Sequence, residues 1–161
     1  ALKEGFDSFI PHDYKELHCY FGNIDVRHHI IRLEASIIDL ADRYMEEAGK
    51  YNAKIYELLP IENESRPLPK TGYYKDTPFA GSWAERTELV KQFNQMVTDM
   101  CERNDWNTWR HPDVYLNSFG ELTFDVMEKP KSVHIAREYY RWDLVKNEPN
   151  SKLTKATLAL F

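Results

Sequence analysis

Cysteine is scarce in this sequence, and long apolar runs are missing from it. Only Cys19 and Cys101 occur among 161 residues, and no CxxC spacing suggests a metal site. Both lie in apolar stretches, so we expect buried, unpaired thiols in a reducing, cytoplasmic compartment, with a disulfide as the less favoured alternative. No apolar run approaches the roughly 20 residues that cross a bilayer, and the first residues lack the apolar core of a secretory signal. We therefore expect no membrane partner.

Clustered positive charge and glycine-rich loops are also lacking. The formal net charge is −5, which makes nucleic acid an unfavoured partner because phosphate contacts need clustered Lys and Arg. The 6 glycines are isolated from one another, so the chain has no glycine-rich phosphate loop, and it has no GxSxG nucleophile elbow. These absences exclude the commonest sequence motifs of nucleotide-binding proteins and of one large class of serine hydrolases.

The composition that remains is that of a globular domain rich in aromatic residues. With 161 residues and 42% hydrophobic content, the chain is expected to fold as one domain over residues 1–161. A chain of this length buries about two thirds of the surface that it exposes when unfolded. Several aromatic residues fall where loops are expected, as covers over the core edge or as the lining of a ligand cleft: Tyr73, Tyr74, Phe79, Trp83, Trp106 and Trp109.

Strand-like and helix-like segments alternate along the sequence. The expected strands are residues 17–21, 54–59, 113–116 and 122–126, and the expected helices are residues 30–48, a helix opened by the capping box Ser82–Glu85, and residues 136–145. Residues 3–12 are expected to be the end of a further helix. Alternation of this kind predicts βαβ units and a mainly parallel sheet with helices on both faces, an α/β fold.

The segment after the first expected strand concentrates polar residues at one place. Gly22 lets the backbone turn sharply, and Asn23, Asp25, Arg27 and His29 follow it. In an open parallel sheet, ligands bind outside the carboxyl ends of the strands, which is where this segment is expected to lie. In the alternative interpretation, Asp25 caps the following helix and Arg27 pairs with a neighbouring carboxylate. The loop that follows Pro60 and residues 117–134 are expected at the same edge.

His134 is the second candidate for chemistry. It stands between Val133 and Ile135, just before the last expected helix. A histidine at such a junction is well placed to act as a general base, whereas a histidine between two β-branched residues can equally be a satisfied core residue. Both interpretations stay open at this level.

Acidic residues recur along the first long helix and suggest a third possibility. Glu34, Asp39, Asp42, Glu46 and Glu47 provide carboxylates of the kind that hold Mg²⁺ in nucleotide hydrolases. Because arginines interleave with them, a solvated charged face is the simpler interpretation. No HxxxH or HxH spacing supports a two-histidine metal site, and no metal or other cofactor is expected.

Three short blocks together resemble the SGNH (GDSL-type) hydrolase-like family. Residues 20–29 (YFGNIDVRHH) resemble its third sequence block, residues 81–86 (GSWAER) resemble the start of one of its helices, and residues 133–135 (VHI) resemble the block that carries its catalytic histidine. The resemblance spans residues 17–140, and it depends on the order and spacing of the blocks because each block is short.

This resemblance implies a flavodoxin-like three-layer α/β/α sandwich that hydrolyses an ester, such as an acyl group on a carbohydrate or a lipid. It implies that His134 is the general base, that Gly22 and Asn23 lie near the oxyanion site, and that Asp25 and Arg27 order that site. The residues that would contact the substrate are Gly22, His29, Arg86 and Tyr74.

The sequence departs from the family at three positions. No GDS block with a nucleophilic serine precedes residue 20, Lys131 stands where the family has an aspartate, and Ile24 stands where it has the oxyanion asparagine. We therefore expect either the C-terminal portion of a larger SGNH-like domain, without its N-terminal strands, or a divergent member.

Two other functions remain open. A non-catalytic binding or assembly module on the same scaffold would use the aromatic loops to contact a partner protein or a glycan. A metal-dependent nucleotide hydrolase would use the acids of the first long helix. If N-terminal strands are lacking, the open edge of the sheet would invite pairing with a partner chain.

Overall fold

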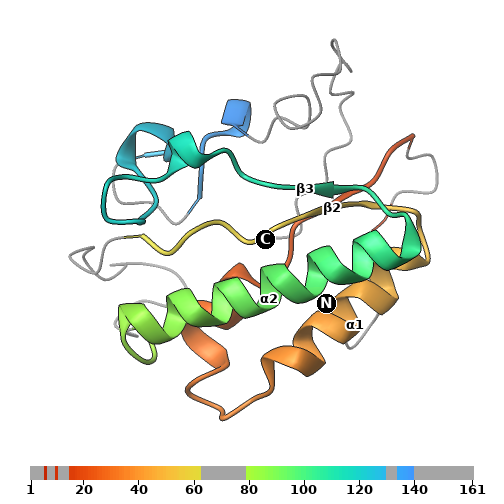
Figure 1. The fold of residues 1–161 in the computed structure, drawn as a ribbon, viewed down its shortest axis with the longest axis horizontal. Helices are drawn as coiled ribbons and strands as arrows, with labels where there is room; N and C mark the ends of the chain where they lie inside the picture. The colour runs from red at the N-terminus through yellow and green to blue at the C-terminus, as the bar shows by residue number, and fades with distance from the viewer. Residues whose placement is uncertain (1–5, 7–9, 11–14, 63–78, 130–133, 140–161) are drawn as a thin grey trace.

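The chain folds around a three-stranded parallel sheet (Figure 1). The computed structural model describes residues 6, 10, 15–62, 79–129 and 134–139. The strands are β1 (His18–Cys19), β2 (Lys54–Tyr56) and β3 (Thr108–Trp109), and they lie side by side in the order β1-β2-β3. The α/β class and the parallel sheet are thus confirmed. The first two strands were expected at these places, although each is shorter than its apolar run.

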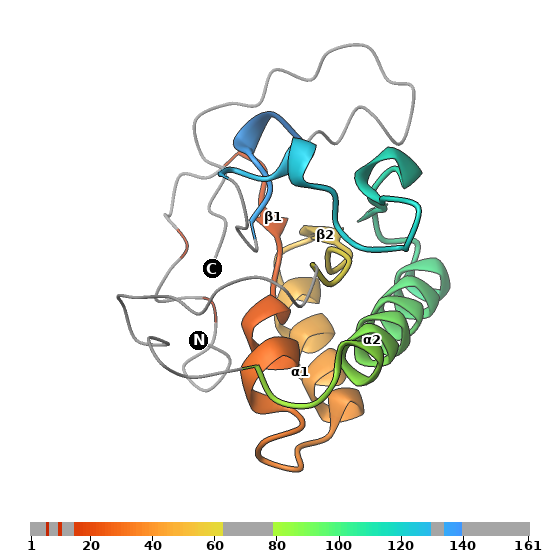
Figure 2. The ribbon, with the colours of Figure 1, turned by 90° about the vertical axis from the view of Figure 1, so that its left-hand side faces the viewer.

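Two helices, α1 (Ile37–Gly49) and α2 (Trp83–Asn104), connect consecutive strands and pack against each other (Figures 1 and 2). Both lie on the same face of the sheet. In the described part of the chain, the other face of the sheet carries no long helix. Because the strand order does not reverse between β1 and β3, two crossovers of the same hand put both helices on one side.

The other face of the sheet carries short turns instead of long helices. The segment with η2 (Asp113–Tyr115), η3 (Phe124–Val126) and η4 (Arg137–Tyr139) lies on the side away from α1 and α2 (Figure 2). Each of these elements is a single 3₁₀ turn. Residues 140–145 of the last expected helix lie outside the described residues.

The first long helix begins later than expected, at residue 37 instead of residue 30. Glu34 has a left-handed backbone with φ of 50°, which interrupts the helix. Ser36 then serves as the N-cap, because its hydroxyl accepts a hydrogen bond from the Asp39 amide at 3.1 Å. Ile30 belongs to the turn before this break, and its apolar side chain is buried without being part of α1.

The strands expected at residues 113–116 and 122–126 are wrong. Residues 113–115 and 124–126 form the turns η2 and η3, and only an isolated antiparallel bridge joins Leu116 to Leu122. The true third strand, β3, precedes them and pairs Trp109 with Tyr56. Short apolar runs fit strands and turns alike, and Pro112 ends the strand before the run begins.

The core lies between the sheet and the two helices. The Tyr44 ring of α1 stacks between Phe21 and Phe93, and its hydroxyl donates to the Cys19 carbonyl at 2.6 Å. Both cysteines are free and buried, as expected. Burial raises the pKa of the Cys19 thiol to about 12, so this thiol is unreactive.

The capping box at the start of α2 is confirmed. The Ser82 hydroxyl accepts from the Glu85 amide at 3.2 Å, and Glu85 accepts from the Ser82 amide at 2.8 Å. Asp105 ends α2 in the left-handed conformation, with φ of 55°. Of the helices in the described part of the chain, none has the length and apolar character that crossing a membrane requires.

Candidate functional site

The segments that directly follow the three strands meet at one edge of the sheet, and the expected segment after Gly22 is one of them. Because the three strands are parallel, the segments that follow them, 20–29 after β1, 57–62 after β2 and 110–111 after β3, leave the same edge of the sheet (Figure 1). This is the edge at which open α/β sheets bind their ligands. The site is therefore built from the carboxyl ends of all three strands.

Arg27 is the centre of a buried network at this edge. Its side chain has no exposed surface, and the carboxylate of Glu62 beside it is 1% exposed. Arg27 Nε and Nη2 donate to Glu62 Oε2 at 2.9 and 2.6 Å, and Nη1 donates to the side chain and carbonyl of Asn23. Nη2 also lies 3.4 Å from the Pro60 carbonyl. The guanidinium thus ties the loop after β1 to the loop after β2.

This network settles one alternative left open by the sequence, because Arg27 does pair with a carboxylate. The carboxylate is that of Glu62, 35 residues further along the chain, which the sequence did not single out. Asp25 pairs with His29 at 3.1 Å, and the cap position of the turn, Ile24, makes no side-chain cap. In this arrangement Asn23 and Arg27 hold the edge together, and Asp25 and His29 lie nearer the surface.

The turn that carries these residues, η1 (Asp25–His29), is π-helical. The Ile30 amide donates to the Asp25 carbonyl at 2.9 Å, a bond across five residues. Gly22 before it has φ of 105°, a conformation that other residues rarely adopt, and a Cβ there would lie 3.4 Å from the Phe93 ring. Single π turns occur frequently at functional sites. The turn brings Arg27 inward.

Arg86 lies at the start of α2 and is 2% exposed. Its Nη1 donates to the Gly81 carbonyl at 2.6 Å, and its guanidinium lies 5.0 Å from the centre of the Phe79 ring. That ring also packs edge-on against His28. Arg86 therefore fixes the approach to α2 beside η1. Tyr74, the other residue expected to contact substrate, lies outside the described residues.

His134 lies beside residues 127–128, on the face of the sheet opposite the helices. Its carbonyl accepts from the Glu128 amide at 2.9 Å, and the next residue, Ile135, bridges to Met127. Its side chain is half-buried. The segment before residue 127 is joined to the segment after β2, because the Leu122 amide donates to the Ile61 carbonyl at 3.3 Å.

A groove of about 640 Å³ opens beside this edge, and the sequence did not predict it. Its volume is that of a pocket for a small molecule. It lies between α2 and the segments that follow β2 and β3. The residues that line it are Glu57, Pro60, Ile61, Trp83, Thr87, Val90, Lys91, Asn94, Gln95, Thr98, Arg110, His111, Leu116, Phe119 and Gly120.

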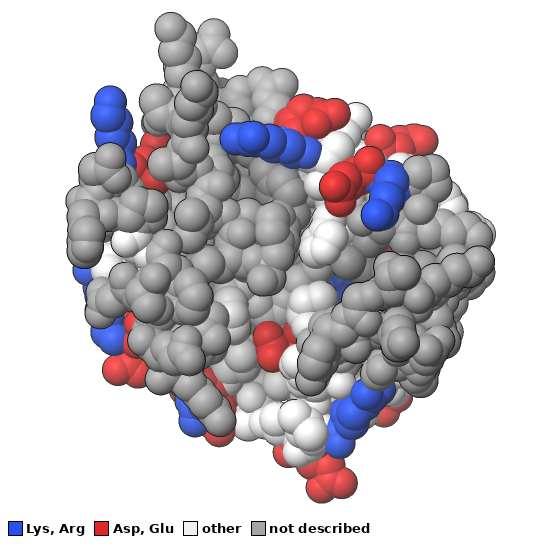
Figure 3. All heavy atoms as spheres, turned by 180° about the vertical axis from the view of Figure 1, so that it is seen from behind, with Lys and Arg blue, Asp and Glu red and all other residues white. Residues whose placement is uncertain are grey.

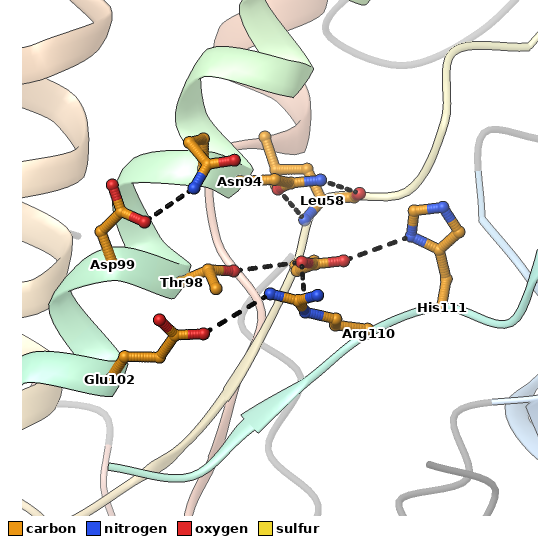
Figure 4. Close-up of polar contacts among 9 residues, drawn as sticks. Leu58, Asn94, Thr98, Asp99, Glu102, Arg110 and His111 are labelled. Carbon is orange, nitrogen blue, oxygen red and sulfur yellow. Dashed lines mark hydrogen bonds and ion pairs between the residues drawn. The ribbon is translucent and has the colours of Figure 1, made fainter. Parts of the chain in front are cut away.

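The polar end of the groove is built around the Glu57 carboxylate (Figure 4). Glu57 is 8% exposed and accepts a hydrogen bond from the Thr98 hydroxyl at 3.2 Å. Arg110 Nε lies 3.5 Å from Glu57 Oε1, and His111 Nδ1 lies 3.7 Å from Oε2. A carboxylate, a guanidinium and an imidazole from two adjacent strand ends therefore face one another. Asn94 pairs with both backbone groups of Leu58 and holds that strand end against α2.

Burial shifts the pKa values of the carboxyl and the imidazole toward each other. Desolvation raises the Glu57 pKa above 4.5, although Arg110 and Thr98 oppose it. Desolvation lowers the His111 pKa below 6.5, opposed by the charge of Asp113. Shifts of this kind, caused by burial next to charged groups, are common at binding and catalytic sites.

Residue order could have indicated this groove once β3 was correctly placed. Glu57 directly follows β2, and Arg110 and His111 directly follow β3. The expectation of a strand at residues 113–116 assigned Arg110 and His111 to a connecting loop, so they received no functional interpretation. No sequence signal indicates that α2 contributes residues to the groove, because Thr87 and Lys91 look like ordinary solvent-exposed helix residues.

The described part of the chain shows neither a metal-ligating cluster nor a strongly charged patch in the view of Figure 3. No group of three or more His, Cys, Asp or Glu side chains is placed to hold a metal ion within the described ranges. Seen from behind, the described acidic and basic side chains are interspersed (Figure 3). On α1, Asp39, Asp42 and Glu46 are exposed, as a solvated charged face requires.

Comparison with known proteins gives no relative. No family model matches the chain, and no match was found among curated proteins or among solved structures.

Proposed function

We propose that this chain belongs to an ester hydrolase of the SGNH kind, whose reaction takes place at the carboxyl edge of the sheet beside Gly22. The observation that carries the proposal is the strand order. Three consecutive parallel strands in the order β1-β2-β3 match strands 3-4-5 of a flavodoxin-like sheet, whose full order is 2-1-3-4-5. In that arrangement β1 borders the position where the strand order reverses, and ligands bind there.

The finer fold of the proposal is a three-layer α/β/α sandwich. It requires two further strands beyond the outer edge of β1 and a helix layer on the face opposite α1 and α2. Within the described sheet β1 has a neighbour on one side only, yet Cys19 and the residues around it are buried. A strand paired to this edge would cover an edge that otherwise invites association.

The nucleophile of the proposal comes from the strand next to β1. Among the serines of the described ranges, Ser36 and Ser82 cap helices and Ser118 lies in an exposed turn, so none follows a strand of the sheet. A serine hydroxyl beside Gly22 would attack the ester carbonyl and release the alcohol, and water would then release the acid. His134 would accept the serine proton in the first step.

In this proposal Asn23 and Arg27 position the site instead of touching the substrate. The donors of Arg27 already engage Glu62, Asn23 and Pro60, and its side chain is fully buried. A group held on several sides at such a junction keeps the loop after β1 in one conformation, and preorganised loops are what oxyanion sites need. Asp25 and His29 are the more accessible pair of the segment.

The test is ester turnover by the full natural chain, with short-chain 4-nitrophenyl esters as substrates. His134→Gln should lower turnover by at least about a hundredfold, the usual contribution of a general base. His18→Gln is the matched control, because His18 is the first residue of β1 and its ring lies 2.8 Å from the Tyr56 hydroxyl. If a folded full chain hydrolyses none of these esters, or if the two variants lose equal activity, the proposal is wrong.

A non-catalytic binding module is the second candidate. It is favoured by the same buried network, because Asn23 and Arg27, two of the four residues expected to be catalytic, already make hydrogen bonds within the protein. Such a module would keep its ligand intact. If an ester binds to the full chain and is recovered intact after prolonged incubation, the result would favour this function over hydrolysis.

A further inference from the structure

The groove beside α2 has a charge arrangement that its own residues do not neutralise. Lys91 makes no ion pair or hydrogen bond within the described part of the chain. Arg110 makes only two long ion pairs there, at 3.5 Å to Glu57 and 3.9 Å to Glu102, and no hydrogen bond. A guanidinium has five N–H donors in a fixed plane, so most of the donor capacity of Arg110 stays available. Two cations thus line the groove against one buried carboxylate.

Three polar atoms along the groove are also buried without hydrogen-bond partners among the described residues. They are Trp83 Nε1, Thr87 Oγ1 and His111 Nδ1. Leaving a buried polar group unpaired costs about 1–3 kcal/mol, so each such atom calls for an explanation. All three belong to residues that line the same groove.

Apolar side chains form the remainder of the wall. Ile61 and Val90 are buried, and Leu116 is half-buried beside them. Phe119 lies at the rim and is 79% exposed. Pockets for small molecules typically combine such apolar walls with a few placed polar groups. An exposed aromatic at the rim is well suited to cover a ring or chain.

We propose that this groove binds a small organic anion, with its charged group on Arg110 and His111, Lys91 adding attraction, and its apolar part against Val90, Leu116 and Phe119. Carboxylates and phosphates share the required chemistry, since both accept planar, charge-assisted hydrogen bonds from a guanidinium. This site does not depend on the proposed ester hydrolysis, because neither Gly22 nor His134 lines the groove.

The affinity for the anion should depend on pH. Thr98 from α2 and Arg110 and His111 from the end of β3 face Glu57, and Asp113 acts on His111. As the pH falls, Glu57, whose pKa is raised, loses its negative charge, and His111, whose pKa is lowered, gains a positive one. Both changes favour a bound anion, so the affinity should rise as the pH falls.

The test uses three probes of matched size: phenylacetate, phenyl phosphate and the neutral benzyl alcohol. Binding is followed by NMR on the ¹⁵N-labelled full chain, where Trp83 gives one of only 4 tryptophan indole N–H signals, assigned with Trp83→Phe. Phenylacetate, phenyl phosphate or both should shift the Trp83 signal saturably, and the stronger of the two identifies the preferred anion. Benzyl alcohol should bind at least about tenfold more weakly, because a charge-assisted contact is lost.

Variants distinguish anion binding in the groove from general electrostatic attraction to the protein. Lys91→Gln combined with Arg110→Gln should weaken anion binding roughly tenfold or more, since charge-assisted contacts are lost. Arg103→Gln, also on α2 but not in the groove lining, is the matched control and should leave binding unchanged. The proposal is overturned if benzyl alcohol binds as well as both anions, if no probe shifts the Trp83 signal, or if Arg103→Gln weakens binding equally. Ester turnover is measured separately, so the two proposals fail independently.

Discussion

Breaking the Arg27–Glu62 pair should be among the most destabilising changes in this chain. Arg27→Met removes the guanidinium but keeps an unbranched side chain of similar length. It removes the hydrogen bonds that Arg27 donates to the Glu62 carboxylate, which is 1% exposed, and to the Asn23 and Pro60 oxygens. Removing one partner of a buried ion pair costs about 3–5 kcal/mol. For a chain of this size that loss lowers the melting temperature by roughly 10 °C.

The matched experiments separate the pair from general damage to the core. Unfolding in urea gives the free energy for the wild type, Arg27→Met, Glu62→Leu and the double variant. The double variant should lose less than the sum of the two single losses, because it removes both charges of the pair, and the coupling energy should be about 1–3 kcal/mol. Arg103→Met, on the exposed face of α2, should change stability by less than about 0.5 kcal/mol. A loss below about 1 kcal/mol for Arg27→Met, or additive losses, would refute the reasoning.

Three further changes test the fold around the site. Gly22→Ala should lower stability by more than Gly120→Ala in thermal unfolding, because the φ of 105° at Gly22 lies further from the left-handed region that other residues can adopt than the φ of 77° at Gly120. A residue with a Cβ in the left-handed region costs about 1–2 kcal/mol. Equal losses at the two glycines would contradict this. Ser82→Ala should cost about 1 kcal/mol of unfolding free energy in urea, since it removes the cap of α2, whereas Ser82→Asp should not. Glu57 has a raised pKa in the folded state, so ionisation of its carboxyl group opposes folding. Its contribution to the free energy of unfolding is present below pH 4.5 and declines as the pH rises through the pKa of the folded state. Glu57→Gln should therefore gain stability relative to the wild type between about pH 4 and pH 7, and a constant difference over that range would be inconsistent with the raised pKa.

The elements with strong local signals were predictable from the sequence. The capping box Ser82–Glu85 fixed the start of α2 to the residue, because its two hydrogen bonds involve only residues three apart. The runs before Gly22 and Pro60 likewise indicated β1 and β2. Parallel pairing follows from the helices between the strands, since a parallel pair needs a long crossover.

Elements decided by distant contacts were not predictable. Nothing local distinguishes the run at residues 113–116 from a strand. This run forms a turn, and the third strand of the described sheet is the preceding β3, whose Trp109 pairs with Tyr56, more than 50 positions away along the chain. The start of α1 depends in the same way on the left-handed Glu34, a conformation with no sequence motif.

The same distinction between local signals and distant contacts applies to the candidate site. The sequence indicated that Gly22 and the polar residues after it lie at the carboxyl edge, because strand order alone puts them there. It left open whether Arg27 faces a substrate or a carboxylate, and the answer required the position of Glu62. The groove around Glu57 and His111 was missed because its walls come from three separate parts of the chain.

The most direct test of ester hydrolysis at the Gly22 edge is covalent labelling of the full natural chain with a fluorophosphonate probe, followed by peptide mapping. The proposal predicts stoichiometric labelling of one serine, slowed at least about a hundredfold by His134→Gln and not by His18→Gln, because only the first removes the general base. A folded full chain that takes up no label, or whose labelling is indifferent to His134, would contradict it.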